Sequence, residues 1–213
     1  MTSSTVAIIT GDLIKSQSNS PDEYRHLIRT LEIGIKEVNQ RVSIKYELFR
    51  GDSFQLEVSE YSRVVEVAIL LRLFLKSKHA KGEWDARLGI GIGSNTISTH
   101  SIGTSTGDAH RHSGSAFDTI KSERLAFSTK NKELNEVLNL TGRFANNLLV
   151  QMTQTQAKFL SYYLWFSPTT HNMLAKQLET SRVNTTQVLN SANYKLIEDY
   201  ISFSTAQIAR MLP

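Results

Sequence analysis

The chain has 213 residues, of which 40% are hydrophobic and 21% charged, and its formal net charge is +4. This balance is typical of a globular protein, excludes collagen-like and disordered chains, and does not by itself indicate nucleic-acid binding. The absence of cysteine excludes a disulfide scaffold, a cysteine-ligated metal site and a thiol nucleophile. The apolar run Val67–Leu71 is far shorter than the ~20 residues of a membrane span. Because no signal-peptide pattern is present, the expectation is a cytoplasmic protein that contacts no membrane.

The first predicted elements are a strand and an amphipathic helix. β-Branched residues over Val6–Thr10 predict a buried strand, which Gly11 and Asp12 end. Pro21 is typical of a first helical turn, and apolar residues at three- and four-residue spacing predict a helix over 21–38.

A hairpin, a buried helix and a glycine-rich strand follow. Apolar and polar residues alternate on both sides of Arg50–Ser53, which predicts a β-hairpin over 46–58. The run 64–75 is apolar on most sides and predicts a buried helix. Alternate glycines over 87–93 predict a strand with close backbone packing in the sheet, and the polar stretch 95–113 predicts a long loop.

The order of elements predicts an α+β fold. A helix over 114–125 and a short strand over 126–128 complete the pattern β-α-β-β-α-β-loop-α-β. This is the split βαβ pattern of ferredoxin-like and palm domains, an antiparallel sheet with helices on one face, here followed by a small all-α part. We expect a palm domain over 1–131 and a helical helix-turn-helix domain over 132–213.

The second part is predicted to consist of helices joined by short turns. Two longer helices are expected over 135–150 and 157–166, and two short ones over 171–178 and 182–192. The short pair has helix-turn-helix spacing of small, apolar, capping and β-branched residues. These residues are Ala175, Leu178, Ser181, Thr185 and Leu189. Glu179 takes the place of the glycine that such turns often carry.

A helix-turn-helix predicts that its second helix enters a DNA major groove. The residues available for bases and phosphates are Lys176, Ser181, Arg182, Asn184, Thr186, Gln187 and Asn190. So few cations predict weak DNA binding unless two copies act together. The alternative is a helical cap or dimerisation module without DNA contact.

Two aspartates lie where the predicted topology brings distant segments together. Asp12 follows the first strand, and Asp52 lies in the hairpin turn. In a split βαβ sheet the first strand lies beside this hairpin, so both carboxylates are expected in one patch. A divalent cation removes their repulsion, and Mg²⁺ or Mn²⁺ is typically held by carboxylates together with substrate phosphates. The alternatives are a strand-end cap for Asp12 and an ordinary turn for Asp52.

Four further residues are candidate ligand contacts. Gly11 and Gly51 precede the two aspartates and would let a ligand approach the backbone closely. Lys15 is placed to meet a phosphate, and Arg111 to meet an anionic ligand.

Histidines crowd the polar stretch before residue 114. His100, His110 and His112 lie there with Asp108, and imidazole and carboxylate groups are ligands of transition metals. The alternative is a mobile polar loop that covers a pocket.

Three blocks of the sequence, in order, resemble the SatD family of bacterial proteins: Ile9–Ser16, Arg50–Gln55 and Arg87–Gly93. The same blocks resemble class III nucleotidyl cyclases and, more distantly, GGDEF diguanylate cyclases. The resemblance covers residues 6–125 for the palm and 150–200 for the tail. It implies a bacterial transcription regulator with a nucleotide cyclase-like palm and a C-terminal helix-turn-helix.

The class III resemblance also implies metal ligands. In that pattern two aspartates bind two metal ions, and they match Asp12 and Asp52. The carbonyl group of Leu13 is an implied additional ligand.

The helix after the glycine-rich strand departs from the class III pattern. Asp118 stands where that pattern has an asparagine that contacts the nucleotide, and Lys121 and Arg124 flank the position of its arginine. This departure favours nucleotide binding over cyclisation. The implied candidates for catalysis are Asp12, Asp52, Lys121 and Arg124.

Three functions follow as alternatives. The preferred one is a regulatory protein that binds a nucleotide or a Mg²⁺–phosphate ligand in the palm and DNA through the tail. The second is a metal-dependent nucleotidyl cyclase or transferase that uses Asp12 and Asp52, for which the resemblance implies a homodimer. The third is a non-catalytic dimerisation or interaction module.

Overall fold

The computed structural model describes residues 4–14, 16, 20–49, 51–95, 106–167 and 169–212. Its strands are β1 (Ser4–Leu13), β2 (Ile44–Leu48), β3 (Ser53–Val58), β4 (Ala86–Asn95) and β5 (Leu125–Thr129). The helices of the first half are α1 (Pro21–Asn39), the 3-10 helix η2 (Tyr61–Arg63), α2 (Val64–Lys78) and α3 (Asp108–Thr119). The later helices are α4 (Lys132–Gln151), α5 (Gln154–Trp165), α6 (His171–Gln177), α7 (Arg182–Ser191) and α8 (Tyr194–Met211). None of these helices is long and apolar enough to cross a membrane.

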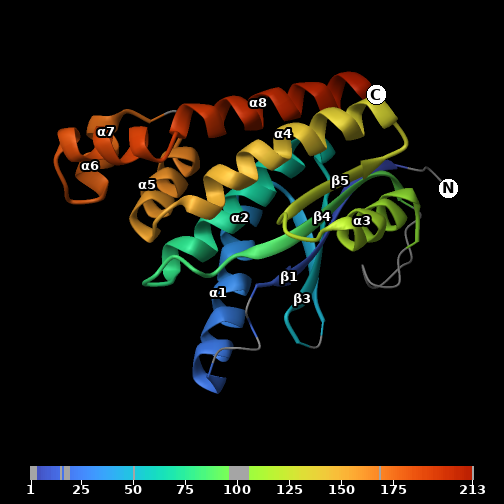
Figure 1. The fold of residues 1–213 in the computed structure, drawn as a ribbon, viewed down its shortest axis with the longest axis horizontal. Helices are drawn as coiled ribbons and strands as arrows, with labels where there is room; N and C mark the ends of the chain where they lie inside the picture. The colour runs from blue at the N-terminus through green and yellow to red at the C-terminus, as the bar shows by residue number, and fades with distance from the viewer. Residues whose placement is uncertain are drawn as a thin grey trace.

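The described strands form one sheet in the order β2-β3-β1-β4-β5, with helices on both faces (Figure 1). Strand β1 pairs antiparallel with β3 and β4, and β2 pairs antiparallel with β3. Strand β5 is added in parallel at the β4 edge. The first four strands with α1 and α2 form the split βαβ arrangement, so the predicted fold class is confirmed.

One face of the sheet belongs to a large hydrophobic core. Alternate side chains of the central strands, such as Ile9 and Ile90, join one cluster with side chains of α1 and α2. The same cluster continues into the helical part through Leu138, Leu160 and Ile197. The division into domains at residues 131 and 132 stays a prediction, and the core extends across that point without a break.

The other face of the sheet carries α3, which rests directly on the glycine-rich strand, so the expectation of helices on one face is wrong. A Cβ atom at Gly89 or Gly91 would overlap backbone atoms of α3, and one at Gly93 would press on the Asp108 side chain. The predicted close backbone packing of this strand is confirmed, with a helix as its partner. Glycine is required here because the distance from helix to sheet leaves no room for a side chain.

The boundaries predicted around α3 are wrong. The sequence predicts a loop over 95–113 and a helix over 114–125, whereas the helix begins at Asp108 and ends at Thr119. The helix contacts the sheet through small residues, which are Ala109, Ser113 and Ala116. A face of this kind shows no hydrophobic periodicity, so the sequence pattern fails to mark it.

The sequence predicts no element after residue 192, but the structure has a long helix there, α8. Helix α8 packs against α4, α2 and η2. It buries Ile197, Tyr200 and Ile208 in the shared core. Figure 1 shows it running along α4 at the outer edge of the molecule.

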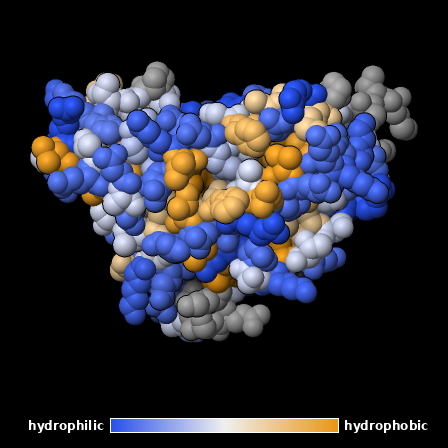
Figure 2. All heavy atoms as spheres, turned by 45° about the horizontal axis from the view of Figure 1, so that its top comes forward, coloured by the Kyte–Doolittle hydropathy of each residue, from blue (hydrophilic) through white to orange (hydrophobic). Residues whose placement is uncertain are grey.

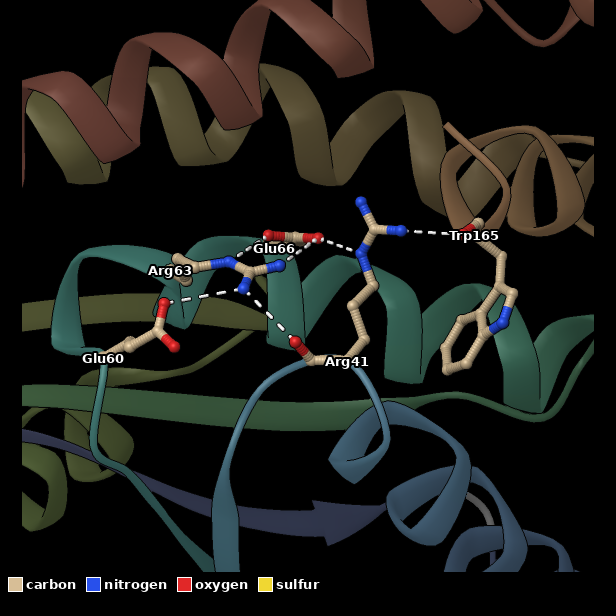
Figure 3. Close-up of polar contacts among 5 residues, drawn as sticks. All are labelled: Arg41, Glu60, Arg63, Glu66 and Trp165. Atoms are coloured by element: carbon tan, nitrogen blue, oxygen red, sulfur yellow. Dashed lines mark hydrogen bonds and ion pairs between the residues drawn. The ribbon is translucent and has the colours of Figure 1, made fainter. Parts of the chain in front are cut away.

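A charged network joins the end of α1 to α2 and to the end of α5 (Figure 3). The Glu66 carboxylate accepts a hydrogen bond of 2.7 Å from Arg41 Nε and one of 2.9 Å from Arg63 Nε. Arg41 Nη1 also donates to the Trp165 carbonyl oxygen at 2.7 Å. Burial acts to raise the pKa of Glu66, but the hydrogen bonds and charges of Arg63 and Arg41 outweigh it and hold that pKa below its ordinary value.

Replacing Gly91 with alanine tests the contact between α3 and the sheet. The new Cβ would overlap the Ala109 carbonyl oxygen and the Ser113 amide nitrogen, so Gly91→Ala is expected to lower the free energy of unfolding by about 3 kcal/mol. The control is Gly114→Ala in the same helix, where a Cβ meets open space and should stabilise by about 0.5–1 kcal/mol. Urea unfolding measures both changes. A Gly91→Ala protein as stable as the Gly114→Ala protein would contradict the packing argument.

Replacing Glu66 with glutamine tests the network. At pH 7, Glu66→Gln should lower the free energy of unfolding by about 2 kcal/mol, because three charged hydrogen bonds are lost or weakened. The folded-state pKa of Glu66 is lowered, so its stabilisation is present above the unfolded pKa and is lost as the pH falls through the folded value. The difference between the two proteins should therefore shrink at pH 3. The exposed pair Glu32–Lys36 supplies the control, Glu32→Gln, with an expected change below about 0.5 kcal/mol at either pH.

Candidate functional site

The end of β1 and the tip of the β2–β3 hairpin lie side by side. Asp12 pairs with Ser53 of β3 on one side and with Arg87 of β4 on the other. The Leu13 amide donates to the Asp52 carbonyl oxygen at 3.1 Å. Strand pairing therefore brings Asp12 and Asp52, 40 positions apart in the sequence, to one end of the sheet.

Both aspartates line one cavity of about 550 Å³. Its charged lining residues are Asp12, Asp52, Arg87, Lys121, Glu123 and Arg124, and the others are Leu13, Ile14, Ser16 and Ser122. Three basic and three acidic groups thus meet at the surface of one hollow, contributed by β1, the hairpin, β4 and the segment between α3 and β5. Lys121 and Arg124, which the class III resemblance implies as candidates for catalysis, line the same cavity as the two aspartates.

Arg87 forms a two-pronged ion pair with Asp12. Its Nε donates to Asp12 Oδ1 at 2.8 Å, and its Nη2 donates to Asp12 Oδ2. The hydrogen bond to Asp12 raises the pKa of Arg87, and the charges of Asp12 and Asp52 add to this effect. The guanidinium also lies over the Phe117 ring, 5.6 Å from its centre. Sequence reasoning did not assign Arg87, although the pairing of β1 with β4 places it opposite Asp12.

Asp52 is held by a buried hydroxyl group. Ser16 Oγ donates a hydrogen bond to Asp52 Oδ2, and the Ser16 residue is 3% exposed. Gly51 adopts a positive φ of 93° in the turn, a conformation that favours glycine. Gly11 serves core packing, because a Cβ atom there would overlap the side chains of Phe54 and Leu88. The space beside Gly11 is occupied by core side chains.

Arg124 is anchored in the interior by Asp85. Arg124 Nη1 donates to Asp85 Oδ2 at 2.6 Å, and Arg72 binds the same carboxylate through Nε at 2.8 Å and Nη2 at 3.0 Å. The side chains of Asp85 and Arg72 are each 1% exposed. Burial acts to raise the pKa of Asp85, but the two guanidinium groups outweigh it and keep that pKa below its usual range. The arrangement holds Arg124 at the wall of the cavity with donors left for a ligand.

Other predicted contacts lie elsewhere. Arg111 pairs with Asp108 at 2.8 Å at the start of α3, near Ser94 of β4 and thus at the end of the helix remote from Phe117 and Arg87. Asp118 is exposed on α3 and does not line the cavity. Lys15 lies outside the described residues.

The histidines near α3 do not converge on a metal site in the described part of the chain. His112 Nδ1 lies 3.0 Å from Ser128 Oγ, and His110 Nε2 is buried without a hydrogen-bond partner. Burial lowers the pKa of both imidazoles. No group of three or more histidine, aspartate or glutamate side chains is placed to hold a metal among these residues, and His100 lies outside them.

The oxygen donors of the cavity suit a hard divalent cation. Asp12, Asp52 and the Leu13 backbone supply the carboxylate and carbonyl oxygens that Mg²⁺ and Mn²⁺ prefer. In the structure, however, both Asp12 oxygens accept hydrogen bonds from Arg87. A cation bound to Asp12 would compete with this guanidinium for the carboxylate, and Arg87 is the counter-charge of Asp12 in the structure.

The two predicted short helices are present as α6 and α7, and they pack on α5. Ala175, Thr185 and Leu189 are buried between them, as their spacing predicts. Ser181 caps α7 by accepting a hydrogen bond of 3.1 Å from the Asn184 amide. Glu179 adopts a φ of 53°, the left-handed conformation that glycine takes at low cost and that costs other residues about 1 kcal/mol.

The outer face of this helix pair carries most of the predicted DNA contacts. Those that are exposed are Lys176, Ser181, Arg182, Asn184, Gln187 and Asn190. Thr186 is half-buried, and its hydroxyl lies 2.9 Å from His171 Nδ1. Val183 is 67% exposed beside them and was not singled out from the sequence.

Comparison with known proteins shows a likeness to cyclase domains in part of the backbone. No family model and no curated protein matches the sequence. The guanylyl cyclase domain of the RhoGC fusion protein from the aquatic fungus Blastocladiella emersonii is 15% identical, with a TM-score of 0.46, over 55% of this chain and 75% of that one. The guanylate cyclase domain of RhGC from Catenaria anguillulae, in complex with GTP, has the same identity and TM-score over 55% and 74%.

An adenylyl cyclase, CyaB from P. aeruginosa, is 12% identical, with a TM-score of 0.42, over 53% of this chain and 70% of that one. These neighbours are guanylyl and adenylyl cyclases. Membership of the SatD family stays a prediction, and so does the assignment of α6 and α7 as a DNA-binding helix-turn-helix.

Proposed function

We propose that the cavity at the end of β1 binds a nucleotide together with a divalent cation, as part of a regulatory protein of the SatD type. The observation that carries this proposal is the shared cavity of Asp12 and Asp52 with Arg87, Lys121 and Arg124. Basic groups in a concave site recognise phosphate, and paired carboxylates recognise the cation that accompanies it. A cavity of about 550 Å³ lies within the range of small-molecule sites.

Arg87 gives the proposed site two states. Without a cation, its guanidinium neutralises Asp12, as in the structure. When a divalent cation binds the two aspartates, Arg87 is released, and its side chain, 42% exposed, is free to meet a phosphate oxygen. The exchange keeps the carboxylates neutralised in both states.

The cavity adjoins a second hollow that reaches the helical part of the chain. A second hollow of about 540 Å³ shares Ile14 and Arg124 with the first and extends to Met152–Thr155, at the start of α5. Helix α5 packs on both α2 and α7. We propose that a ligand bound to Arg124 shifts the residues at this junction. The shift would change the position of α7 relative to DNA.

The proposed DNA contact rests on the exposed polar face of α7. Arg182 at its first turn is placed for a phosphate, and Gln187 and Asn190 offer amide groups for base edges. The face carries few cations, so binding is expected to be weak and strongly salt-dependent.

Replacing Asp52 with asparagine tests nucleotide binding. Isothermal titration of the full chain with ATP and GTP, each with Mg²⁺ or Mn²⁺, is expected to show saturable binding to the wild type. Asp52→Asn should weaken the metal-dependent binding at least tenfold, because one of two carboxylate ligands is lost, which is a change of about 1.4 kcal/mol or more. The control is Asp118→Asn, an exposed carboxylate outside the cavity, which should bind like the wild type.

Two outcomes decide between the alternatives. No binding of any nucleotide with either metal would overturn the proposed site. Formation of a cyclic nucleotide, or of another product of nucleotidyl transfer, in the same mixtures would favour the cyclase or transferase alternative, provided that Asp52→Asn abolishes the product. The juxtaposition of two carboxylates in one cavity is the observation on which that reading rests.

Substitutions in α7 test the DNA contact. Arg182→Ala and Gln187→Ala should each weaken binding to a genomic fragment library about fivefold or more at low salt, measured by fluorescence anisotropy. The matched control is Lys36→Ala, which removes an exposed cation from α1. The DNA proposal fails if the wild type ignores the library, or if Lys36→Ala weakens binding as much as Arg182→Ala does.

A further inference from the structure

The second hollow, which adjoins the cavity of Asp12 and Asp52, is rich in cations. It has a volume of about 540 Å³ and lies where the end of α2 and the turn after it meet the end of α4 and the start of α5 (Figure 1). Its charged lining residues are Lys76, Lys81, Glu83 and Arg124. Most of the other lining is polar, unlike the face in Figure 2, where hydrophobic side chains gather near the middle of the view. We call this space the Lys76 hollow.

Lys76 is a buried cation at the wall of the hollow. The residue is 5% exposed, and its ammonium group donates to the Gly82 carbonyl oxygen at 2.7 Å and to the Val150 carbonyl oxygen at 3.3 Å. An ammonium group has three N–H donors, so one donor remains for another acceptor. Burial lowers the pKa of Lys76, and the charges of Arg124 and Arg72 add to this effect, whereas the charges of Asp85 and Glu83 oppose it. Both hydrogen-bond partners are neutral, so no direct contact neutralises the charge.

The buried cluster behind the hollow has more cations than carboxylates. Among the described residues, Arg72 and Arg124 form ion pairs with Asp85 alone. Lys76 lies within the electrostatic reach of all three. Three cations and one carboxylate leave a net charge of +2, and Arg72 Nη1 is buried without a hydrogen-bond partner. Because unpaired charge is costly away from water, the cluster is arranged to gain from an anion in the hollow.

The start of α5 adds hydrogen-bond donors to the same hollow. Gln154 and Thr155 are the first two residues of this helix, and both line the hollow. The first amides of a helix have no acceptor within it and lie at its positive end. A Cβ atom at Gly82 would lie 2.9 Å from the Gln154 amide nitrogen, so glycine lets the turn after α2 approach the helix start closely. The amides and the cations therefore face one space.

We propose that the Lys76 hollow binds a phosphate group, held by Lys76, Lys81, Arg124 and the first amides of α5. A phosphate monoester carries close to two negative charges at pH 7, which matches the net charge of the buried cluster. Arginine, lysine and the amides of a helix start are the groups that proteins use to bind phosphate. The third donor of Lys76 gains an acceptor in the same step.

Two sources of this phosphate group share the same chemistry. The hollow and the cavity of Asp12 and Asp52 have Arg124 in common. One source is the terminal phosphate of a nucleotide bound in that cavity, and in this form the inference rests on the proposed function. The other source is free phosphate or pyrophosphate, which needs no nucleotide.

Titration calorimetry of the full chain with inorganic pyrophosphate, in the absence of metal, tests the site. The wild type is expected to bind it saturably. Lys76→Met and Lys81→Ala should each weaken binding about fivefold or more, because each removes one cation from the hollow. Lys81 is exposed, so Lys81→Ala decides the test even if Lys76→Met fails to fold. The control is Lys78→Ala, an exposed lysine of α2 outside the hollow, which should bind like the wild type.

Three results would overturn the site. These are a wild type that does not bind pyrophosphate, binding that Lys81→Ala leaves unchanged, and binding that Lys78→Ala weakens as much as Lys81→Ala does. Asp52→Asn should not weaken metal-free pyrophosphate binding, because Asp52 lines the other cavity. Pyrophosphate binding therefore succeeds or fails separately from the proposed nucleotide site.

Titration with ATP and AMP, each with Mg²⁺, distinguishes the two sources. If a nucleotide supplies the phosphate, Lys81→Ala should weaken ATP binding about fivefold and leave AMP binding unchanged, because AMP lacks the terminal phosphate. If free phosphate is the ligand, Lys81→Ala should weaken pyrophosphate binding and leave ATP binding unchanged.

Discussion

The contact of α3 with the bare backbone of β4 positions the three basic groups of the candidate site. Three alternate glycines of β4 let the helix lie directly on the sheet, closer than any side chain would permit. Because α3 lies so close, its last turn brings Phe117 over the Arg87 guanidinium. The segment that follows the helix carries Lys121 and Arg124 to the same cavity as Asp12. A larger residue in the glycine strand would move the helix, and these cations would move with it.

Charge balance governs the cavity itself. Exposed ion pairs contribute little to stability, but Arg87 and Asp12 are partly buried and joined by two hydrogen bonds. Behind them Asp85 is buried between Arg72 and Arg124. Removing either the carboxylate or the Arg72 guanidinium would leave a buried charge without its partner, which costs several kcal/mol of stability. Arg124 is held by the buried carboxylate of Asp85, whereas Arg87 is held by a carboxylate that lines the open cavity.

The helical part is tied to the sheet domain by apolar packing and by one charged network. Side chains of α4, α5 and α8 join the main core, while α6 and α7 share a smaller cluster with α5 around Phe159, Leu174 and Leu189. Arg41 bonds the backbone at the end of α5 and the carboxylate of Glu66 on α2. Helices α5 and α8 both contact α7 and the α2 helix of the sheet domain.

The sequence by itself determined most of the elements whose residues carry a period: the first strand, the core helices α1, α2, α4 and α5, and the spacing of Ala175, Ser181 and Leu189. It also indicated that Asp12 and Asp52 lie at one end of the sheet, because the first strand of a split βαβ sheet lies beside the hairpin. The start of α3, the ion pair of Arg87 and the burial of Asp85 were decided by the tertiary structure alone. A helix that packs through alanine and serine on glycine shows no hydrophobic pattern, and the partner of a charged side chain depends on strand register, which no local property of the chain specifies.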